Sequence, residues 1–498
     1  MRIYLFTCFL LFQYSMLIGK DFNILDFGAV ADRVTLNTTH IQSAIDAAHK
    51  EGGGRVIIPA GYFLSGSIII RSGVELHVMK GGVLLGSTDP VHYRKLNRWI
   101  AFILADSEKN IAITGHGVID GQGRELALHI DSLFYAGKLD TADYNLVEMR
   151  PMHYIRPQLV EFVNCSHIRI HNITMKNAAC WVQTYDKCNH LVMDSVRVDS
   201  DAYWNNDGID VQDCKNVRIT NCIINSSDDG ICLKSQSPQH YCDSIYIANC
   251  RVRSSSNAIK FGTVSLGGFK NVVIENIEVY FTFRSVVAIE CVDGGFLENI
   301  RIENIKGLNV GNPIFIKLGK RPVMNKVGTL KNIILKNFFV IVSFERTDYG
   351  FEIRGPSLPF FHNPFPSSIT GIPGHLVENV VLEDIKISYP GRGNKGMAYM
   401  PLSRLDDVPE NEGDYPEFSM FGELPSWGFY VRHVKGLQMK NVEIGIDKND
   451  YRPAMVFDDV MDLDFQSLMI HGDNKPAGIV LYKTGEVSMD KAYSILKM

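Results

Sequence analysis

The chain has 498 residues and a mass of 55.9 kDa, with 46% hydrophobic and 21% charged residues. This composition can bury a large core and excludes a disordered chain, and length alone predicts about three domains. The net charge of −5 comes from 50 basic and 55 acidic residues spread along the chain. This distribution argues against a nucleic-acid partner and against an anionic membrane surface.

The amino terminus has the pattern of a secretory signal peptide. Arg2 gives a positive start, and residues 3–18 are almost uncharged and mostly apolar. This stretch is short for a membrane span, and no second one follows. We expect residues 1–19 to be a signal peptide and the mature protein to be secreted or periplasmic. An amphipathic or core helix is the alternative.

The next pattern predicts a helix that covers the amino-terminal end of the fold. Thr38 or Thr39 can cap a helix that runs to about Lys50. Its apolar residues recur at the spacing of one helix face: Ile41, Ala44, Ile45 and Ala48. We expect residues 20–95 to form this capping region and the first coils of a stack.

One phrase then recurs many times along the chain. Its copies begin at Glu108, Cys165, Cys188, Cys214, Cys242, Phe269, Phe296, Leu330, Val377, Val434 and Val460. The central spacings are 23, 26, 28, 27 and 27 residues. Each copy is two short strands of alternating apolar residues separated by a polar pair. Such a unit cannot bury its apolar face alone, so successive copies must stack into a solenoid.

This period predicts an all-β fold, a parallel β-helix whose coils stack at about 4.8 Å. Leucine-rich repeats are the competing interpretation, but their Leu framework and helical segments are missing from the sequence. The recurrent asparagines are expected to form ladders at a bend between strands: Asn172, Asn221, Asn249, Asn276, Asn304, Asn337 and Asn441.

We predict a solenoid over residues 96–472 and a carboxy-terminal tail over 473–498. Long insertions are expected at 124–156, 341–376 and 388–432. Aromatic residues of the last two would either wall a groove or cover exposed strands: Phe360, Phe361, Phe365, Tyr399, Trp427 and Tyr430.

Nine of the ten cysteines lie between Cys165 and Cys291. An odd number does not suit a full disulfide framework, so small buried thiols in the stack are favoured. No pair of Cys-x-x-Cys motifs and no His cluster at ligand spacing occurs. We therefore predict no zinc site, no other metal and no cofactor.

Aligning four successive copies reveals a column of charged side chains. The aligned segments are Asp207-Gly-Ile-Asp-Val, Asp229-Gly-Ile-Cys-Leu, Asn257-Ala-Ile-Lys-Phe and Val287-Ala-Ile-Glu-Cys. If the central isoleucines stack inside, one outward column is Asp210, Cys232, Lys260 and Glu290. Asp207, Asp228 and Asp229 then meet in one patch, where Gly208 and Gly230 leave the surface open.

Stacked like charges raise at least one pKa, so that one carboxyl group keeps its proton while its neighbours are ionised. Cleavage of a glycosidic bond needs both forms: one carboxylic acid to protonate the leaving oxygen and one carboxylate to activate water. The alternatives are a column of Asx turns and a calcium site.

These residues resemble the signature of glycoside hydrolase family 28, the polygalacturonase and rhamnogalacturonan hydrolase family. The motif is Asn205-Asn206-Asp207-Gly208-Ile209-Asp210 followed by Ser227-Asp228-Asp229-Gly230, and residues 27–29, 52–59 and 115–121 are also similar. The resemblance implies a right-handed single-stranded parallel β-helix and an inverting hydrolase. It also implies that Asp228 is the general acid, while Asp207 and Asp229 hold and deprotonate the water.

Two family motifs are not kept. The family's Gly-His-Gly falls on Ser256-Asn257-Ala258, and its Arg-Ile-Lys falls on Ala288-Ile289-Glu290. These differences leave the three acids in place but remove cations that in the family usually contact galacturonate. The identity of the sugar is therefore not determined. Lys260 could restore a cation to the site, or it could merely pair with Glu290 across adjacent coils.

Further cations could meet a uronate or be solvated surface charges: Arg284, Lys317, Lys320, Arg321 and Arg354. Trp181, one coil before Asp207, could stack on a sugar ring or serve packing. The residues we predict to bind substrate are Trp181, Asp210, Asn257, Lys260 and Glu290.

Three functions follow as hypotheses. The first is a monomeric, exo-acting inverting hydrolase of pectic polysaccharides or oligosaccharides, of galacturonan or rhamnogalacturonan type, without a membrane span or a nucleic-acid partner. The second is a β-helix polysaccharide lyase, which would need an Arg or Lys base. The third is a glycan-binding solenoid without catalytic activity.

Overall fold

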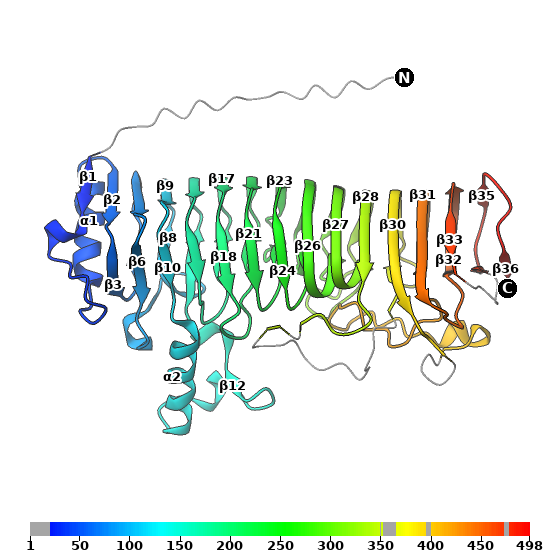
Figure 1. Cartoon of the computed structure of the whole chain (residues 1–498), viewed down its shortest axis with the longest axis horizontal. Helices are drawn as coiled ribbons and strands as arrows, with labels where there is room; N and C mark the ends of the chain where they lie inside the picture. Colours follow the sequence, from blue (N-terminus) through cyan, green and yellow to red (C-terminus); the bar gives the residue numbers. More distant parts are fainter. Residues whose placement is uncertain (1–19, 349, 352–364, 395–399, 473–477) are drawn as a thin grey trace, which may run out of the picture.

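A computed structural model describes residues 20–348, 350–351, 365–394, 400–472 and 478–498. The predicted signal peptide lies outside these described residues, as do Phe360, Phe361, Tyr399 and Arg354. The molecule is an elongated stack of coils, with α1 (Thr38–Lys50) at one end and the carboxy terminus at the other (Figure 1).

Three parallel sheets run along the axis of the stack. The first contains β4 (Ile68–Ile69), β8 (Ile100–Asp106), β13 (Gln158–Val163), β16 (Gln183–Asp186), β19 (Ile209–Gln212), β22 (Ile231–Ser235), β25 (Ile259–Ser265), β29 (Ser367–Thr370), β34 (Ile479–Tyr482) and β36 (Ile495–Lys497). The second contains β1 (Asp21–Asn23), β2 (Gly54–Ile58), β5 (Val74–Val78), β9 (Lys109–Thr114), β14 (Ser166–His171), β17 (Asn189–Asp194), β20 (Lys215–Thr220), β23 (Cys242–Ala248) and β35 (Val487–Met489). The third contains β3 (Gly61–Ser65), β6 (Gly82–Gly86), β10 (Val118–Asp120), β15 (Thr174–Lys176), β18 (Arg197–Ser200), β21 (Ile223–Ser226), β24 (Arg251–Ser254) and β33 (Met469–His471).

Longer strands bend through the corners and contribute to more than one sheet: β26 (Gly268–Cys291), β27 (Phe296–Leu318), β28 (Thr329–Val342), β30 (Val377–Gly391), β31 (Phe429–Lys448) and β32 (Met455–Gln466). The antiparallel strand pairs among the described residues are β7 (Arg94–Lys95) with β8, and β11 (Tyr144–Asn145) with β12 (Arg150–Pro151). The predicted all-β parallel β-helix is therefore confirmed.

The period-two alternation of each strand fills the inside of the solenoid. Val217 and Ile219 of β20 lie in register with Ile245 and Ile247 of β23, and all four are buried. Burying a side chain of this size contributes about 1.5–3 kcal/mol. One main cluster of buried apolar residues runs from Phe22 to Leu481, so a single core extends along the stack, and two smaller clusters lie under the insertions.

The predicted asparagine ladder lies at a bend of the coil. Asn304 has a φ of 57° and donates to the side chain of Asn276 at 3.0 Å, and Asn337 donates to Asn304 at 2.7 Å. Asparagine tolerates this left-handed conformation better than most residues. A second ladder that we did not predict links Asn271, Asn299, Asn332 and Asn379.

The nine described cysteines are all buried, and none forms a disulfide. Cys188 and Cys214 lie on successive coils, where the Cys188 backbone N–H donates to the Cys214 sulfur at 3.3 Å. The Cys214 thiol donates in turn to backbone carbonyls at 3.2 Å. The prediction of stacked free thiols is confirmed.

Helix α1 buries Ile41, Ala44, Ile45 and Ala48 as predicted, but its cap differs from the prediction. The N-cap residue is Asn37, and no side chain caps the helix. Asn37 instead exchanges hydrogen bonds with the backbone of Val30, and the Thr38 hydroxyl accepts from Gly66 N–H at 2.7 Å. The Asn37 and Thr38 side chains therefore bind the start of the helix to neighbouring segments of the chain.

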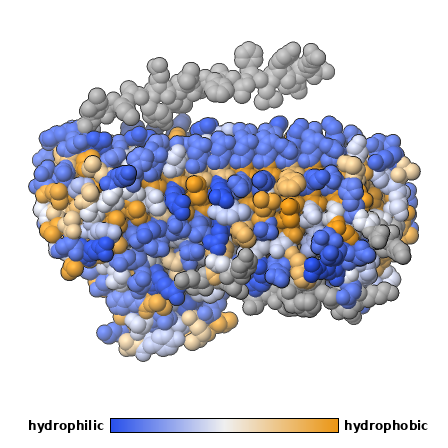
Figure 2. All heavy atoms as spheres, in the orientation of Figure 1, coloured by the Kyte–Doolittle hydropathy of each residue, from blue (hydrophilic) through white to orange (hydrophobic). Residues whose placement is uncertain are grey.

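The insertion predicted at 124–156 contains a second helix, α2 (Gly123–Tyr135). Its residues Leu126, Ala127 and Ile130 pack on Ala179 and Tyr203. Figure 1 shows α2 and the later insertions on the same side of the solenoid. On the face shown in Figure 2, a row of hydrophilic residues runs along one long edge beside a band of apolar residues.

The described parts of the other insertions cover strands of the first sheet. Phe365 and Tyr430 are buried with Phe315, Leu405 and Phe418 in one cluster. Trp427 is also buried. Phe365 therefore takes part in this cover, Tyr430 of β31 lies beneath it, and Trp427 packs into the main core.

The solenoid extends beyond residue 472. Strand β34 pairs with β32, and β36 pairs with β34. The predicted tail therefore includes strands of the stack, which the sequence pattern did not reveal because each is only three or four residues long.

Candidate active site

Two adjacent strands of the first sheet bring three aspartates together. Ile209 of β19 lies opposite Ile231 of β22, so the turns before these strands also lie side by side. Asp207 and Asp229 are 3% and 4% exposed, and one carboxylate oxygen of each lies within 4.8 Å of the other. Asp228 is half-buried beside them.

The glycines after these acids have a different role from the predicted one. A Cβ at Gly208 would lie 2.6 Å from the carbonyl oxygen of Gly230, and one at Gly230 would lie 2.7 Å from that of Ala258. Glycine is required here because the next coil approaches closely, and not because the surface must stay open.

Lys234 of β22 neutralises part of this acidic patch. Its ammonium lies 2.8 Å from Asp207 Oδ2 and 2.6 Å from Asp210 Oδ1. Burial raises the pKa of Asp207 well above its usual value and that of Asp210 to about 6, against the attraction of Lys234. Sequence reasoning missed Lys234, although it points outward in register with Gln212, two residues after the Cys232 of the predicted column.

Asp210 itself is fully buried. It holds Lys234 in place by its ion pair, which is a positioning role, and its contact with substrate stays a prediction.

A second lysine compensates Asp229. The Lys260 ammonium lies 3.0 Å from Asp229 Oδ2, and Asn257 donates to Oδ1 from its side chain at 2.8 Å and its backbone at 3.1 Å. Burial alone would raise the pKa of Asp229, but Lys260 and the Asn257 hydrogen bond outweigh it and lower the pKa to about 2. Asp229 is therefore ionised.

Asp228 has a different environment. The Asn205 amide approaches its Oδ2 at 3.4 Å, and Arg156 holds Asn205 by donating to its side-chain oxygen at 2.7 Å. Burial and the charge of Asp229 raise the pKa of Asp228. Two neighbouring carboxyl groups thus differ in their affinity for protons.

Glu290 does not continue the column of Lys260 as predicted. Lys260 lies opposite Ala288, and Glu290 lies two residues further along β26. Asn257 accepts from the backbone of Ser285, which gives this coil an offset of 28 residues where the motif alignment assumed 30. The repeated Ala-Ile pair misled the alignment.

Glu290 is buried and accepts a hydrogen bond from the Thr263 hydroxyl at 3.1 Å. Burial raises the pKa of Glu290 to about 7. Lys260 forms its ion pair with Asp229, so of the two alternatives for Lys260 the structure has a cation within the acidic patch and not the pair with Glu290.

The insertion 388–432 supplies one wall of the site. Lys260 donates to the Tyr415 hydroxyl at 3.1 Å, and Arg284 lies 3.3 Å from Glu417. Lys317 donates instead to the Glu410 carbonyl at 3.0 Å, and Arg321 pairs with Asp293 at 2.7 Å. Of these cations, Arg284 is the one whose charge acts on Asp228 and Asp229, whereas Lys317 binds the insertion and Arg321 pairs within the stack.

Aromatic side chains form the opposite wall. Trp181 packs edge-on against Trp99, with ring centroids 4.8 Å apart, and lies 5.5 Å from His153 of the first insertion. The Lys234 ammonium lies 4.7 Å from the Trp181 ring. Trp181 is partly exposed, so it can still offer a face to a sugar.

The family model for "Glycosyl hydrolases family 28" matches residues 52–337, which include Asp207, Asp228 and Asp229. The chain belongs to this family. A relative from Vitis vinifera named "Probable polygalacturonase" is 28% identical over 386 residues, 74% of this chain and 69% of the relative. The "Exo-poly-alpha-D-galacturonosidase" of Dickeya chrysanthemi is 23% identical over 417 residues, 75% of this chain and 64% of that protein.

Solved structures agree with the fold of this family 28 glycoside hydrolase. The family 28 exopolygalacturonase of Yersinia enterocolitica covers 95% of this chain and 78% of its own, with 19% identity and a TM-score of 0.59. The adhesin PfbA of Streptococcus pneumoniae covers 86% of this chain and 90% of its own, with 14% identity and a TM-score of 0.51. The same fold therefore occurs in an adhesin, and the argument for hydrolysis rests on the acids.

Within this family 28 site, Asp207, Asp229 and Cys232 have ligand atoms close enough to share a cation. Two ammonium groups already bind these carboxylates, which opposes the entry of a metal ion. The Cys232 thiol donates to the Gly262 carbonyl at 3.1 Å.

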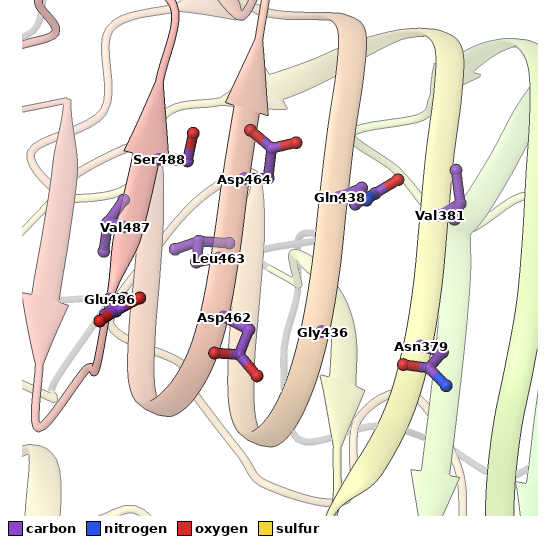
Figure 3. A pocket seen from close by; sticks show the side chains of 10 residues that line it. All are labelled: Asn379, Val381, Gly436, Gln438, Asp462, Leu463, Asp464, Glu486, Val487 and Ser488. Carbon is purple, nitrogen blue, oxygen red and sulfur yellow. The ribbon is translucent and has the colours of Figure 1, made fainter.

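A cavity of about 790 Å³ lies elsewhere, on the second sheet near the carboxy terminus (Figure 3). Asp462, Asp464 and Glu486 line it, and none of its ten lining residues is a cation. Among the described residues, no helix has the length and hydropathy that a membrane crossing requires.

Proposed function

We propose that this family 28 glycoside hydrolase cleaves glycosidic bonds of pectic polysaccharides or oligosaccharides by single displacement with inversion. The observation that carries the proposal is the arrangement of Asp207, Asp228 and Asp229. Oxygens of Asp207 and Asp229 within 4.8 Å of each other can both bind one water molecule, since a hydrogen bond of this kind spans about 2.7 Å. The raised pKa of Asp228 suits a carboxyl group that keeps its proton.

In this mechanism Asp228 gives its proton to the glycosidic oxygen as the bond to the anomeric carbon breaks. The water attacks the opposite face of that carbon, and the Asp207 and Asp229 pair accepts its proton. The products are an alcohol and a sugar of inverted configuration, and the proton then returns to Asp228 through solvent. The positive charges of Lys234 and Lys260 balance the carboxylates of Asp207 and Asp229 while the proton is transferred.

Exo action and export belong to the same proposal. The insertions place Tyr415 on one side of the acids and His153 on the other, which favours a short binding site over an open groove. Names of relatives such as "Exopolygalacturonase" from Zea mays support exo action. The apolar segment at residues 3–18 supports a secreted or periplasmic location.

A polysaccharide lyase is less well supported by these contacts. It would need an unprotonated Lys or Arg as base. Although burial disfavours its charged form, Lys260 has its pKa raised well above the usual value by Asp229 and Glu290, and Lys234 is raised in the same way by Asp207 and Asp210. Both lysines are held protonated.

The test is Asp228→Asn, measured as release of reducing ends from defined pectic oligosaccharides. Loss of the general acid should lower kcat by about 10²–10⁴-fold. Asp462→Asn, an exposed carboxylate of the remote cavity, is the matched control and should retain full activity. A folded Asp228→Asn protein with normal turnover would refute the proposal, and polarimetry of the wild-type products tests inversion.

A further inference from the structure

We infer that the sugar bound beside the catalytic acids on the Tyr415 side is uncharged, and that Glu417 enforces this choice by placing its carboxylate beside the guanidinium of Arg284. The inference rests on the proposed function and names the class of substrate for that site. It comes from the charges that surround the acids and from the partner that each cation already has.

Three cations lie among the acids, and each has a carboxylate of the protein as its partner. Lys234 binds Asp207 and Asp210, Lys260 binds Asp229, and Arg284 binds Glu417. The Lys234 and Lys260 side chains are 10% and 2% exposed, and that of Arg284 is 11% exposed. A uronate that enters this space meets three cations that are already compensated.

Carboxyl groups outnumber the cations at this site. Six surround the three cations: Asp207, Asp210, Asp228, Asp229, Glu290 and Glu417. A further carboxylate would approach the ionised Asp229 and the ion-paired Glu417, and like charges at short range repel strongly where water is excluded. A sugar that carries only hydroxyl groups avoids this repulsion, because carboxylates accept hydrogen bonds from hydroxyls.

Glu417 is the residue on which this discrimination depends. Arg284 is the cation of the three whose partner comes from the insertion and not from the acidic patch. The Arg284 backbone N–H donates to the Ser256 carbonyl at 2.9 Å, beside the Asn257 that binds Asp229, and the Arg284 charge acts on Asp228 and Asp229. A group bound to its guanidinium therefore lies near the acids. The Glu417 carboxylate lies 3.3 Å from one terminal nitrogen of this guanidinium, so it repels a uronate carboxylate that approaches Arg284. The buried Nε of Arg284 has no hydrogen-bond partner among the described residues.

The neighbouring Tyr415 supplies an uncharged surface for the same sugar. Its side chain is 53% exposed, while its hydroxyl is held by Lys260 at 3.1 Å. An aromatic ring that is fixed at one end and open on its face suits the apolar face of a sugar ring. The wall therefore combines a neutral platform with a carboxylate that repels anions.

The experiment compares two oligosaccharides that differ only in the sugar at the cleaved end, a galacturonate in one and its methyl ester in the other. We expect kcat/KM of the wild-type protein to be at least about tenfold higher for the neutral ester. Glu417→Gln should reduce this ratio at least about threefold by improving cleavage of the free acid. Glu412→Gln is the matched control. Glu412 contacts Lys320 through its backbone carbonyl, which accepts from the Lys320 backbone N–H, so changing the side chain should leave the ratio unchanged.

Equal or better cleavage of the free acid by the wild-type protein would overturn the inference, and an unchanged ratio in Glu417→Gln would overturn the assignment to Glu417. Calorimetric binding of the two corresponding product sugars to the wild-type protein gives the same comparison without turnover. If neither substrate is cleaved, the proposed function fails, while the binding preference still decides this inference.

Discussion

Replacing Lys260 with methionine tests how the site divides its protons. The change removes the ammonium 3.0 Å from Asp229 Oδ2 and leaves the two hydrogen bonds from Asn257. Burial favours the protonated form of Asp229, and without Lys260 fewer groups stabilise its charge. The pKa of Asp229 should therefore rise from about 2 to at least its ordinary value of 3.8. A rise of about two units corresponds to about 2.7 kcal/mol at 1.36 kcal/mol per unit.

The sign of the effect on activity follows from the role of Asp229. The carboxylate must be ionised to hold and deprotonate water, so activity is lost as the pH falls through its pKa. The acid limb of the kcat/KM profile should therefore move to higher pH by about two units in Lys260→Met. Initial rates on one neutral oligosaccharide, taken as a ratio to the wild-type protein at each pH, measure this shift.

Lys317→Met is the matched control for this measurement. Lys317 is equally buried, but it donates to the carbonyls of Gly371 and Glu410. Its loss should destabilise the protein without moving the acid limb. If Lys260→Met is folded by near-ultraviolet circular dichroism and keeps the wild-type acid limb, the assignment of Lys260 is wrong.

Three further predictions concern stability and thiol chemistry. Glu290 stabilises the fold in its protonated form. This contribution is fully present below about pH 4.5 and is lost as the pH rises through about 7. Glu290→Gln should therefore raise the free energy of unfolding above pH 7 and change it little below pH 4.5. Urea titrations at both pH extremes measure the difference, and equal effects at both would contradict it. Asn304→Gly should lower the free energy of unfolding by about 1 kcal/mol for each ladder hydrogen bond that it removes. Asn304→Ala should lower it by about 1–2 kcal/mol more, because alanine is strained at a φ of 57°. Urea midpoints should fall in the order wild type, Gly, Ala, and the reverse order of the two variants would refute the reasoning. The nine cysteines from Cys165 to Cys291 should react with iodoacetamide only after denaturation, because all are buried thiols, and peptide mass spectrometry would show any that react in the native protein.

The sequence was sufficient for the fold and for the three acids because both depend on a period. The spacing of the repeats predicted the stack, and the offset between Asp207 and Asp229 placed these acids on adjacent coils. Lys234 could have been found in the same way, since its outward position follows from strand parity. Glu290 was misplaced because the repeated Ala-Ile pair suggested an offset of 30 residues, whereas Lys260 lies opposite Ala288 at an offset of 28.

The walls of the site have no such period. Tyr415 meets Lys260 across 155 residues of sequence, and Glu417 meets Arg284 from the same insertion. These contacts depend on how an irregular segment folds over the strands, which neither alternation nor repeat length determines. For the same reason the partner of Lys260 was open between two interpretations at the level of sequence.

Stacking also constrains how the charge of such a site can change. In a parallel stack each outward side chain has neighbours on the coils before and after it, at about 4.8 Å. A column of one sign is therefore costly, and charges along the first sheet alternate or are separated by neutral residues. Glu290 lies opposite Lys317, and Arg432 lies opposite Asp458 with an ion pair at 2.9 Å. A carboxyl group at position 290 thus has cations on adjacent coils, and a change of sugar specificity at one coil requires compensating charges on the next.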